Sequence, residues 1–486
     1  MENTGKNSVL DQLRLFGASD VGKKVEFDAR LHAITENEDT LTLLMRDTEC
    51  FAMVIPSRSE GNHSQAYTVE SVIRVFGVLI DCGKQPFGVE GDGRVMTVHA
   101  MTLTVLSRAA PNLTETMHHS APKPANQSII DLVSSLTLQE RLNNRVLDVR
   151  VASTAAIFKI FSGALELAAE FCLTNGFHWT HTPGLINYKI PYDNDYFPLP
   201  YFDRELAWLT QTGEVHLQMA MSMDFMRLFE IRNVFRAEKE INKRRLTEFT
   251  IFETVVAWER DWTEITDLAE SFLVFVIRGL QEREKYEDAI RAAKRLHSSA
   301  GLFKLGLDEQ GKLPRLQYSE AKELLRKRFS AKTGDLDDMT PEQEANLGAL
   351  MRTTPAKGPP TDAFIITNYP ARHRAFQIHP SPPSASGEPT PGTNSFDIIA
   401  HGREICTGYQ HIHDYTMLRD TMRARDPVGF DPDSPMWRPY VGAFEAGVHP
   451  HGGFAFGMNR VVQTFLGLED VHEACMFPRN ANRISP

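Results

Sequence analysis

The sequence predicts an α+β protein in which a small all-β domain precedes a larger domain that mixes strands and helices. Residues 22–108 alternate apolar and polar side chains in short runs such as VEFDARL, at the spacing of strands. Residues 154–172 instead repeat apolar side chains at helical spacing, and this helix is expected to end near Gly176. Strand-like and helical pieces then alternate up to the C-terminus, which completes the α+β pattern.

Changes in composition divide the chain into domains. Short strands separated by polar turns predict a small barrel or sandwich for residues 1–108. The segment that follows is rich in Pro, Ser and Asn, so we place a linker at 109–140 and the larger domain at 141–486. Within the larger domain, residues 379–395 contain too much Pro, Ser and Gly to pack, which predicts a mobile loop.

Charge and cysteine content narrow the classes of function. The 486 residues include 52 Lys and Arg against 63 Asp and Glu, and this acidic balance does not favour nucleic-acid binding. Five cysteines occur without a CxxC pair, so neither a zinc site nor a disulfide framework is indicated. The N-terminus has no secretory pattern and no apolar run is long enough to span a bilayer. We therefore expect a cytoplasmic protein without a membrane partner.

The segment FRAEKEINKRRLTEF, residues 235–249, places both signs of charge between two strand-like runs. We interpret it as a hairpin in which one strand ends at Phe235, a polar loop occupies 239–243 and the next strand begins near Arg244. Arginines on facing strands can hold a polyphosphate because guanidinium groups match phosphate oxygens, and Glu238 can accept a hydrogen bond from an adenine amino group. A solvated hairpin with cross-strand ion pairs explains the same charges, and this segment alone leaves both interpretations open.

A second phosphate-binding signal lies near the C-terminus. HGGFAFGMNR, residues 451–460, precedes an amphipathic helix that Arg460 opens. Glycines allow a close backbone approach, and the N-terminus of a helix favours anions. A glycine-rich run by itself is weak evidence, but together with the charged hairpin it favours a nucleotide site.

Three stretches together resemble the motifs of class II aminoacyl-tRNA synthetases. GFHWTHTPGL at 176–185 is similar to motif 1, and the charged hairpin and the glycine-rich run are similar to motifs 2 and 3. RLNNRVLDVR at 141–150 and ICTGYQHIHD at 405–414 resemble the aspartyl/asparaginyl subgroup, in its eukaryotic or archaeal aspartyl type. The resemblance covers nearly the whole chain. It implies an N-terminal OB-fold barrel that reads the anticodon in the family, an antiparallel sheet flanked by helices, and a homodimer formed through the motif 1 region.

This resemblance implies a role for each residue of an ATP site. Arg236 would grip the α-phosphate, and Arg244 would reach the γ-phosphate. Glu238 would meet the adenine edge, and Phe249 would stack under the ring. Arg460 would cover the other face of the ring or the phosphates.

The resemblance also implies a Mg²⁺ site and a reaction. Asp397 and Glu404 match the acidic Mg²⁺ ligands, and Thr407 lies where the family has a serine. Hard oxygen ligands suit a Mg²⁺ ion that bridges phosphates. A substrate carboxylate would attack the α-phosphate in line and release pyrophosphate, without a protein nucleophile. We therefore expect an adenylate-forming, ATP-dependent ligase with Arg236 and Arg460 as catalytic residues.

The amino-acid pocket departs from the aspartate-binding pattern. The family's lysine that pairs with the aspartate carboxylate falls on Leu217, and the arginine that grips the same carboxylate falls on His411. Burying a carboxylate without cations costs roughly several kcal/mol, which argues against aspartate as the substrate. Glu253 retains an acid near the substrate's α-ammonium group. The candidate substrate-binding residues are Gln211, Glu214, Leu217, Gln218, Glu253, Gln410 and His411.

The barrel departs from the family pattern as well. Thr42 occupies the position of an aromatic residue that stacks on an anticodon base, and Asp47 and Thr48 replace two glutamines that read it. Such a stack is worth about 1–3 kcal/mol per base. Residues 1–108 also carry 11 Lys and Arg against 15 Asp and Glu, a net charge of −4 that suits a phosphate backbone poorly. These features make tRNA a possible but doubtful partner.

Two pairs of histidines with the same spacing invite a metal-site interpretation. His449 and His451 lie in HPHGG, and His411 and His413 lie in QHIHD. HPHGG resembles the family's PHGGG, which leads into motif 3. We interpret the likeness between the pairs as one of sequence only, and expect a structural or substrate-lining role.

Three functions are compatible with these observations. The first is an aspartyl-tRNA synthetase-like ligase that activates an amino acid or a related carboxylate. The second is a repurposed paralogue that passes the activated acyl group to a small-molecule amine or hydroxyl. The third is a catalytically silent ATP-binding regulatory protein, which the joint presence of ATP and Mg²⁺ ligands argues against.

Overall fold

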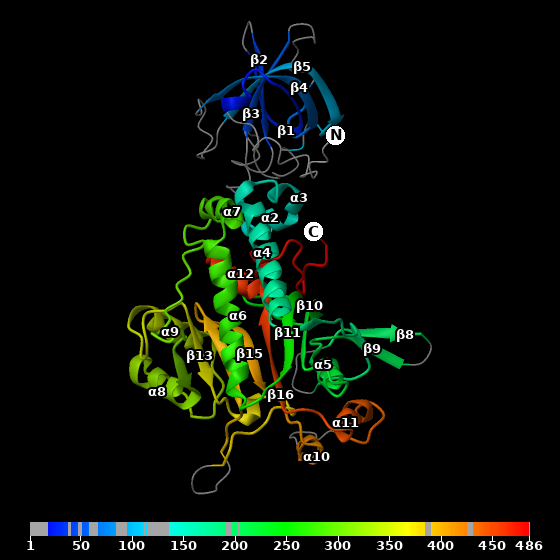
Figure 1. Cartoon of the computed structure of the whole chain (residues 1–486), viewed down its shortest axis with the longest axis vertical. Helices are drawn as coiled ribbons and strands as arrows, with labels where there is room; N and C mark the ends of the chain where they lie inside the picture. The colour runs from blue at the N-terminus through cyan, green and yellow to red at the C-terminus, as the bar shows by residue number, and fades with distance from the viewer. Residues whose placement is uncertain are drawn as a thin grey trace. The chain divides into compact units, whose positions relative to one another are not determined.

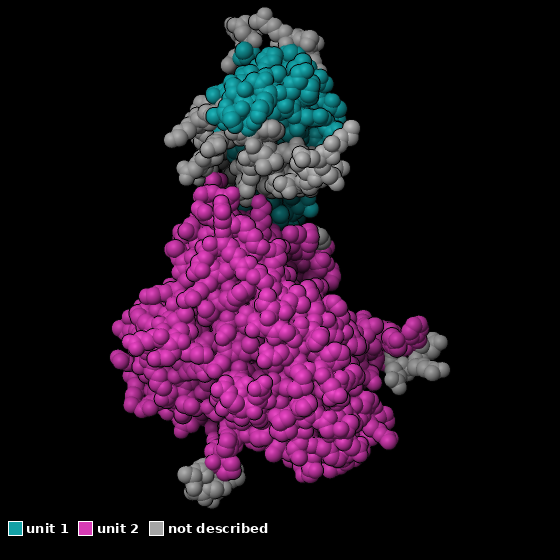
Figure 2. Space-filling view, viewed as in Figure 1, with its two compact units in different colours: residues 1–155 teal, residues 156–486 magenta. Residues whose placement is uncertain are grey.

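The chain forms two compact units, residues 1–155 and 156–486. The first contains a closed barrel and the second a large sheet flanked by helices, so the α+β prediction is confirmed (Figure 1). Figure 2 shows the two units in different colours. The computed structural model describes residues 18–36, 40–46, 51–57, 67–83, 95–110, 113, 136–190, 196–202, 205–383, 390–424 and 431–485.

The elements follow one another in the order that the alternation of patterns predicts. The first unit contains η2 (Ala18–Asp20), β1 (Lys24–Glu36), β2 (Leu41–Arg46), β3 (Phe51–Pro56), β4 (Val72–Gly83), β5 (Val95–Ser107), α2 (Leu138–Asn143) and α3 (Arg145–Asp148). Helix α4 (Ala152–Thr174) begins at the end of this unit and continues into the second. The strands of the second unit are β6 (His178–Trp179), β7 (Leu185–Ile186), β8 (Pro198–Tyr201), β9 (Glu205–Leu209), β10 (Arg227–Phe235), β11 (Glu248–Ala257), β12 (Arg315–Gln317), β13 (Ala363–Thr367), β14 (Ser395–Ala400), β15 (Arg403–Gln410) and β16 (His451–Gly457). Its helices are α5 (Glu214–Met221), α6 (Thr263–Glu282), α7 (Glu284–Lys294), α8 (Tyr318–Phe329), α9 (Pro341–Thr353), η5 (Ala371–His373), α10 (Tyr415–Ala424), α11 (Arg438–Glu445), α12 (Met458–Leu466) and η6 (Val471–Ala474).

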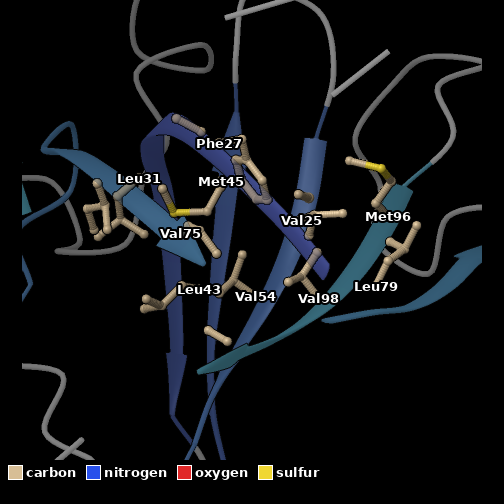
Figure 3. Packing of buried hydrophobic residues seen from close by; sticks show 14 of the residues in the cluster. Val25, Phe27, Leu31, Leu43, Met45, Val54, Val75, Leu79, Met96 and Val98 are labelled. Atoms are coloured by element: carbon tan, nitrogen blue, oxygen red, sulfur yellow. The ribbon is translucent and has the colours of Figure 1, made fainter. Parts of the chain in front are cut away.

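The barrel closes in the strand order β1-β2-β3-β5-β4. Only β3 and β5 pair in parallel, and the other neighbours are antiparallel. Alternate residues of β1, including Phe27 and Leu31, are fully buried and meet Val75 and Val98 inside the barrel (Figure 3). The period-two pattern therefore fills the barrel with apolar side chains, which confirms the OB-fold prediction.

A buried ion cluster organises the short helices that follow the barrel. Asp148 is fully buried and accepts hydrogen bonds from Arg141 Nε at 2.8 Å and Arg145 Nη1 at 2.5 Å. Thr154 Oγ1 donates to the same carboxylate at 3.2 Å. These contacts explain the spacing of RLNNRVLDVR, because a buried carboxylate needs cationic partners.

An eight-stranded sheet, in the order β12-β13-β14-β15-β16-β11-β10-β6, is the frame of the second unit. It is antiparallel except at its two outer pairs, β12 with β13 and β10 with β6. Helix α6 packs on one face, where the ring of Phe272 stacks on Phe252 at 4.3 Å between centroids and tilts against Phe456 at 4.8 Å. Because strand residues alternate between faces, their neighbours in sequence are directed to the opposite face.

The charged hairpin differs from its predicted form. Strand β10 ends at Phe235 as expected, but β11 begins at Glu248 instead of near Arg244. Arg236 N still donates to Thr247 O at 2.9 Å, and the residues between these two leave the ladder. Charged side chains of this segment pair with partners outside the hairpin or across the loop, as described below.

Three other segment predictions have mixed outcomes. The helix predicted over 154–172 is α4, and it stops before Gly176, whose φ is +75°. The flanks of the Pro- and Ser-rich segment are hydrogen-bonded, with Ser381 N donating to Gly392 O at 2.9 Å, and the mobility of 379–395 stays a prediction. Residues 384–389, and most of the proposed linker at 109–140, lie outside the described residues.

Candidate active site

One cavity in the second unit collects most of the predicted site residues. It lies on the face of the sheet that alternates with the α6 face, so Phe249 and Glu253 line it whereas Phe252 packs on α6. The predicted residues in its lining are Gln211, Glu214, Leu217, Arg236, Glu238, Arg244, Phe249, Glu253, Glu404, Thr407, His411 and Arg460.

Two predicted residues of the nucleotide half lie together. The guanidinium of Arg236 lies over the ring of Phe249, 5.5 Å from its centroid. Arg236 Nε is buried and has no hydrogen-bond partner among the described residues. Since buried donors are normally paired, this atom marks a place where an acceptor is expected.

Two ion pairs extend the charged segment. Arg245 Nη1 donates to Glu238 at 2.5 Å. The residue predicted to contact adenine is therefore in an ion pair within the loop. Arg244 donates to Glu344 of α9, one hundred residues away. Burial, followed by the nearby charge of Glu404, raises the pKa of Glu344 to about 7 against the opposing effect of Arg244. Sequence reasoning missed Glu344 because nothing local in α9 marks it.

Arg460 is positioned by main-chain contacts. Its Nη1 donates to Glu404 O at 2.9 Å and its Nη2 donates to Arg244 O at 3.3 Å. Gly453 lies in β16, the strand that leads to Arg460. It has no room for a side chain, because a Cβ there would collide with the backbone oxygen of Thr254. The glycine-rich strand therefore keeps its backbone at the cavity wall, as the sequence predicts.

The predicted Mg²⁺ ligands form an oxygen-rich corner. Thr407 Oγ1 donates to Asp397 Oδ1 at 2.8 Å and contacts Glu404 Oε1 at 3.2 Å. Asp397 also accepts a hydrogen bond from Arg374 Nη2 at 2.8 Å, a partner that the sequence did not reveal. Burial raises the pKa of Asp397 to about 6; Arg374 opposes the rise and Glu404 adds to it.

This corner fits Mg²⁺ by the chemistry of its donors. Two carboxylates and a hydroxyl oxygen are the hard ligands that Mg²⁺ takes when substrate phosphates complete its coordination. Among the described residues, no group of three or more His, Cys, Asp or Glu side chains could hold a metal ion by itself.

The amino-acid half of the cavity is centred on Glu214. Its Oε1 accepts hydrogen bonds from His411 Nε2 at 2.8 Å, Gln218 Nε2 at 3.0 Å and Gln377 Nε2 at 3.1 Å. Its Oε2 accepts from Tyr409 Oη at 2.5 Å. Burial disfavours the charged form of Glu214, but the hydrogen bonds from His411, Tyr409 and Gln377 outweigh burial and lower its pKa. This carboxylate is therefore an anion at neutral pH.

Glu253 is a second buried acid with the opposite behaviour. It lies directly across the β10–β11 ladder from Glu230. Its Oε2 accepts a hydrogen bond from Gly213 N at 2.7 Å, and its Oε1 accepts from the Thr212 hydroxyl. Burial raises the pKa of Glu253 to about 7, and the charge of Glu230 contributes to the rise. A substrate ammonium group would favour its ionised form.

Three of the predicted residues do not line the cavity. Asp397 reaches it through Thr407, and Gln218 reaches it through Glu214 while accepting a hydrogen bond from Tyr440 Oη at 2.8 Å. Gln410 is a correction to the sequence-based expectation. Its Oε1 accepts from Asn394 Nδ2 at 2.7 Å, because strand alternation directs it away from the face that carries Tyr409.

The histidine pairs are also corrected. The two pairs were expected to be alike in sequence only. In the structure they are in contact, because the rings of His411 and His451 lie 4.9 Å apart between centroids. Their geometry is that of ring packing, in agreement with the structural or substrate-lining role. Burial and the charge of His411 lower the pKa of His451 well below its usual value, which keeps this ring neutral.

With its sheet, its arginine-rich cavity and its acidic corner in place, the chain has the architecture of an ATP-dependent ligase. Residues 137–481 match the family described as tRNA synthetases class II (D, K and N), and the chain belongs to this family. It is an ATP-dependent ligase of the aminoacyl-tRNA synthetase type. The prediction of this family and subgroup is confirmed.

Named relatives and solved structures agree with this assignment. The chain is 30% identical to the human cytoplasmic aspartate–tRNA ligase over 426 residues, which are 87% of this chain and 78% of that protein. It is 29% identical to the cytoplasmic aspartate–tRNA ligase 1 of Arabidopsis thaliana, over 96% of this chain and 84% of that one. The aspartyl-tRNA synthetase structure from Entamoeba histolytica superposes with a TM-score of 0.78 at 26% identity, covering 99% of this chain and 93% of the other.

A further structure shows the likeness of the fold alone. Asparaginyl-tRNA synthetase from Pyrococcus horikoshii superposes with a TM-score of 0.76 at 23% identity, over 96% of this chain and 97% of that one. The comparisons give no support to the small-molecule transferase or to the silent regulatory protein. Separately, no helix within the described residues is both long and apolar enough to cross a bilayer.

Proposed function

We propose that the chain activates an amino acid with ATP, forms an aminoacyl-adenylate and passes the acyl group to tRNA. The observation that carries the proposal is the unpaired Nε of Arg236, buried in the wall of the cavity. A buried donor without a partner costs free energy, and an anion that binds it recovers that cost. The α-phosphate of ATP would supply this anion, because guanidinium groups pair well with phosphate oxygens.

The remaining residues of the nucleotide half support the same proposal. Phe249 would stack under the adenine ring, with Glu238 at the edge of the ring. Arg244 would reach the γ-phosphate from its position beside Glu344. Arg460, anchored on two main-chain oxygens, would cover the ring or the phosphates.

Asp397, Glu404 and Thr407 would hold Mg²⁺ together with phosphate oxygens. When bound there, the ion would neutralise charge on the phosphates and favour departure of pyrophosphate. The protein's own contribution is to orient the substrate carboxylate for in-line attack and to stabilise the developing charge with Arg236 and Arg460. Glu253 would bind the α-ammonium group of the amino acid.

An exchange assay tests this proposal. The purified protein, incubated with ATP, Mg²⁺ and radiolabelled pyrophosphate, is expected to form labelled ATP only when a suitable amino acid is added. The assay covers the twenty standard amino acids one by one, with a reaction lacking amino acid as the control. Exchange that is absent with every one of them, or independent of any of them, would contradict adenylate formation.

The acceptor is a separate part of the proposal. The relatives are named as cytoplasmic ligases of tRNA. From this kinship we infer that tRNA is the acceptor here. We infer the cytoplasm as the location on the same ground. In the barrel, Thr42 lies on β2, whereas Asp47 and Thr48 lie outside the described residues. Charging of total tRNA with the amino acid that supports exchange would test the acceptor. Exchange without charging would point to a different acceptor.

An exposed apolar patch supports a homodimer formed through the motif 1 region. The patch consists of Leu173, Trp179, Phe225 and Met226, whose side chains are 41–56% exposed. It lies beside β6, the outer strand of the sheet. Large apolar side chains gathered at a sheet edge are typical of interfaces between subunits.

Replacing Trp179 with Asp is expected to raise the dimer dissociation constant at least 10-fold. The reason is that burying a charge in place of an aromatic ring costs several kcal/mol unless the charge is paired. Sedimentation velocity over a concentration series measures the change. Leu302→Asp, at a 64% exposed position outside the patch, is the matched control and should leave the constant unchanged. Equal dissociation constants for Trp179→Asp and the parent protein would exclude this face as the interface.

A further inference from the structure

The side-chain end of the amino-acid pocket carries a specificity that the aspartate-named relatives do not suggest. It is formed by Glu214 with its four donors, and by the apolar Leu217 beside them. Leu217 is fully buried in a cluster with Met221, Leu228 and Val255. The position expected to hold a lysine is therefore part of the apolar core.

The hydrogen bonds at the side-chain end of the pocket show which donors and acceptors are left for a ligand. The donors of Gln218, Gln377, Tyr409 and His411 all point to the carboxylate of Glu214. Four donors match the acceptor capacity of one carboxylate. Each of these four groups therefore commits a donor to Glu214 and not to a substrate side chain.

By contrast, Gln377 has an acceptor at this end of the pocket that is not hydrogen-bonded. Gln377 must turn its amide nitrogen to the carboxylate of Glu214, which directs its Oε1 the other way. That oxygen is buried and has no hydrogen-bond partner among the described residues, although Gln377 is only 1% exposed and lines the cavity.

The cations of the cavity lie elsewhere. Arg244 and Arg245 pair with Glu344 and Glu238 in the nucleotide half. Arg374 pairs with Asp397 at the acidic corner. The described residues place an anion and the unpaired acceptor of Gln377 at the side-chain end, where a bound aspartate would need cations and donors.

From this arrangement we infer that the enzyme accepts an amino acid whose side chain donates N–H hydrogen bonds, an amide or an ammonium, and rejects aspartate. The inference rests on the proposed adenylate-forming function for its catalytic meaning. Gln377 Oε1 would receive a donor of the side chain, next to the negative charge of Glu214. A carboxylate in the same place would meet the charge of Glu214 and leave Gln377 unpaired, and sites built on hydrogen bonds discriminate strongly against such a partner.

The test compares amino acids with and without N–H donors in the side chain, by a measurement that does not need catalysis. Isothermal titration calorimetry, with a non-hydrolysable ATP analogue and Mg²⁺ present, gives dissociation constants for aspartate, asparagine, lysine and valine. Asparagine and aspartate differ in charge and donors but hardly in size. We expect asparagine or lysine to bind at least about 10³-fold more tightly than aspartate, and the two arms separate an amide from an ammonium substrate.

Two variants tie the discrimination to Glu214. Glu214→Gln removes the charge and is expected to reduce the preference over aspartate at least 10-fold. Glu287→Gln, the same change at an exposed position on α7, should retain the full preference. The comparison in the parent protein stands even if Glu214→Gln fails to fold.

The outcomes separate this inference from the proposed function. Binding of aspartate or valine as tight as that of asparagine and lysine, or binding of none of the four, overturns the inference. Preferred binding of a donor side chain without pyrophosphate exchange supports the inference and contradicts the proposed function. Exchange with aspartate as the best substrate supports the proposed function and contradicts the inference.

Discussion

Replacement of Arg236 by alanine is expected to reduce ATP–pyrophosphate exchange about 10³-fold. Arg236 offers the buried, unpaired guanidinium donor that we assign to the α-phosphate, where charge develops during attack. Removing one preorganised donor to such a charge costs about 10²–10³ in rate, and an arginine on a transferring phosphoryl group can be worth about 10³ or more. The measurement is the initial rate of exchange with the best amino acid at saturating ATP.

Two further variants make this result specific. Arg236→Lys keeps the charge but loses the planar fork, so it is expected to recover only a small part of the rate. Arg227→Ala removes an arginine from the same strand, β10, outside the cavity, and should retain the parental rate. An Arg236→Ala rate within 10-fold of the parent, in a protein with an unchanged circular dichroism spectrum, would remove Arg236 from the phosphate site.

The pH dependence of stability is expected to change when Glu253 is replaced by glutamine. The pKa of Glu253 is raised from its usual 4.5 to about 7 in the folded chain, by burial first and by Glu230 second. Between these values the folded state binds a proton that the unfolded state releases. The contribution of Glu253 therefore lowers stability as the pH rises from about 4.5 to about 7. The full effect is about 3 kcal/mol, since one pKa unit corresponds to about 1.4 kcal/mol.

Chemical denaturation at pH 5 and pH 7.5 measures this effect. The parent protein should lose more stability between the two pH values than Glu253→Gln, because glutamine does not titrate. Asp397 and Glu344 have pKa values raised in the same direction, so the variant should reduce the slope without abolishing it. Glu287→Gln, at an exposed glutamate, is the control. An identical slope in parent and Glu253→Gln would show that Glu253 ionises normally.

Much of the fold could be predicted because it depends on local patterns. The alternation in residues 25–31 predicted β1, and the helical spacing of 154–172 predicted α4 to within two residues at each end. The start of β11 was placed about four residues early. In the structure Arg244 and Arg245 pair through their side chains with Glu344 and Glu238, and the ladder begins only at Glu248.

The nucleotide half of the site was accessible to sequence reasoning because its residues lie in two short segments with characteristic spacing. Arg236, Phe249 and Arg460 line one cavity as the motifs predicted. Gln410 was assigned to the cavity, yet the same strand alternation that brings Tyr409 to it excludes Gln410. Applying period two along β15 would have corrected this assignment and added Tyr409 to the candidates.

The sequence by itself determined the family, the order of the elements and the residues of the proposed nucleotide site, because each of these depends on contiguous motifs. Only the tertiary structure decided the electrostatics of the amino-acid pocket. Glu214 receives hydrogen bonds from Gln377, Tyr409 and His411, which lie more than 160 residues further along the chain. Whether a carboxylate is buried, paired and ionised depends on such distant partners, and no local pattern in a sequence records them.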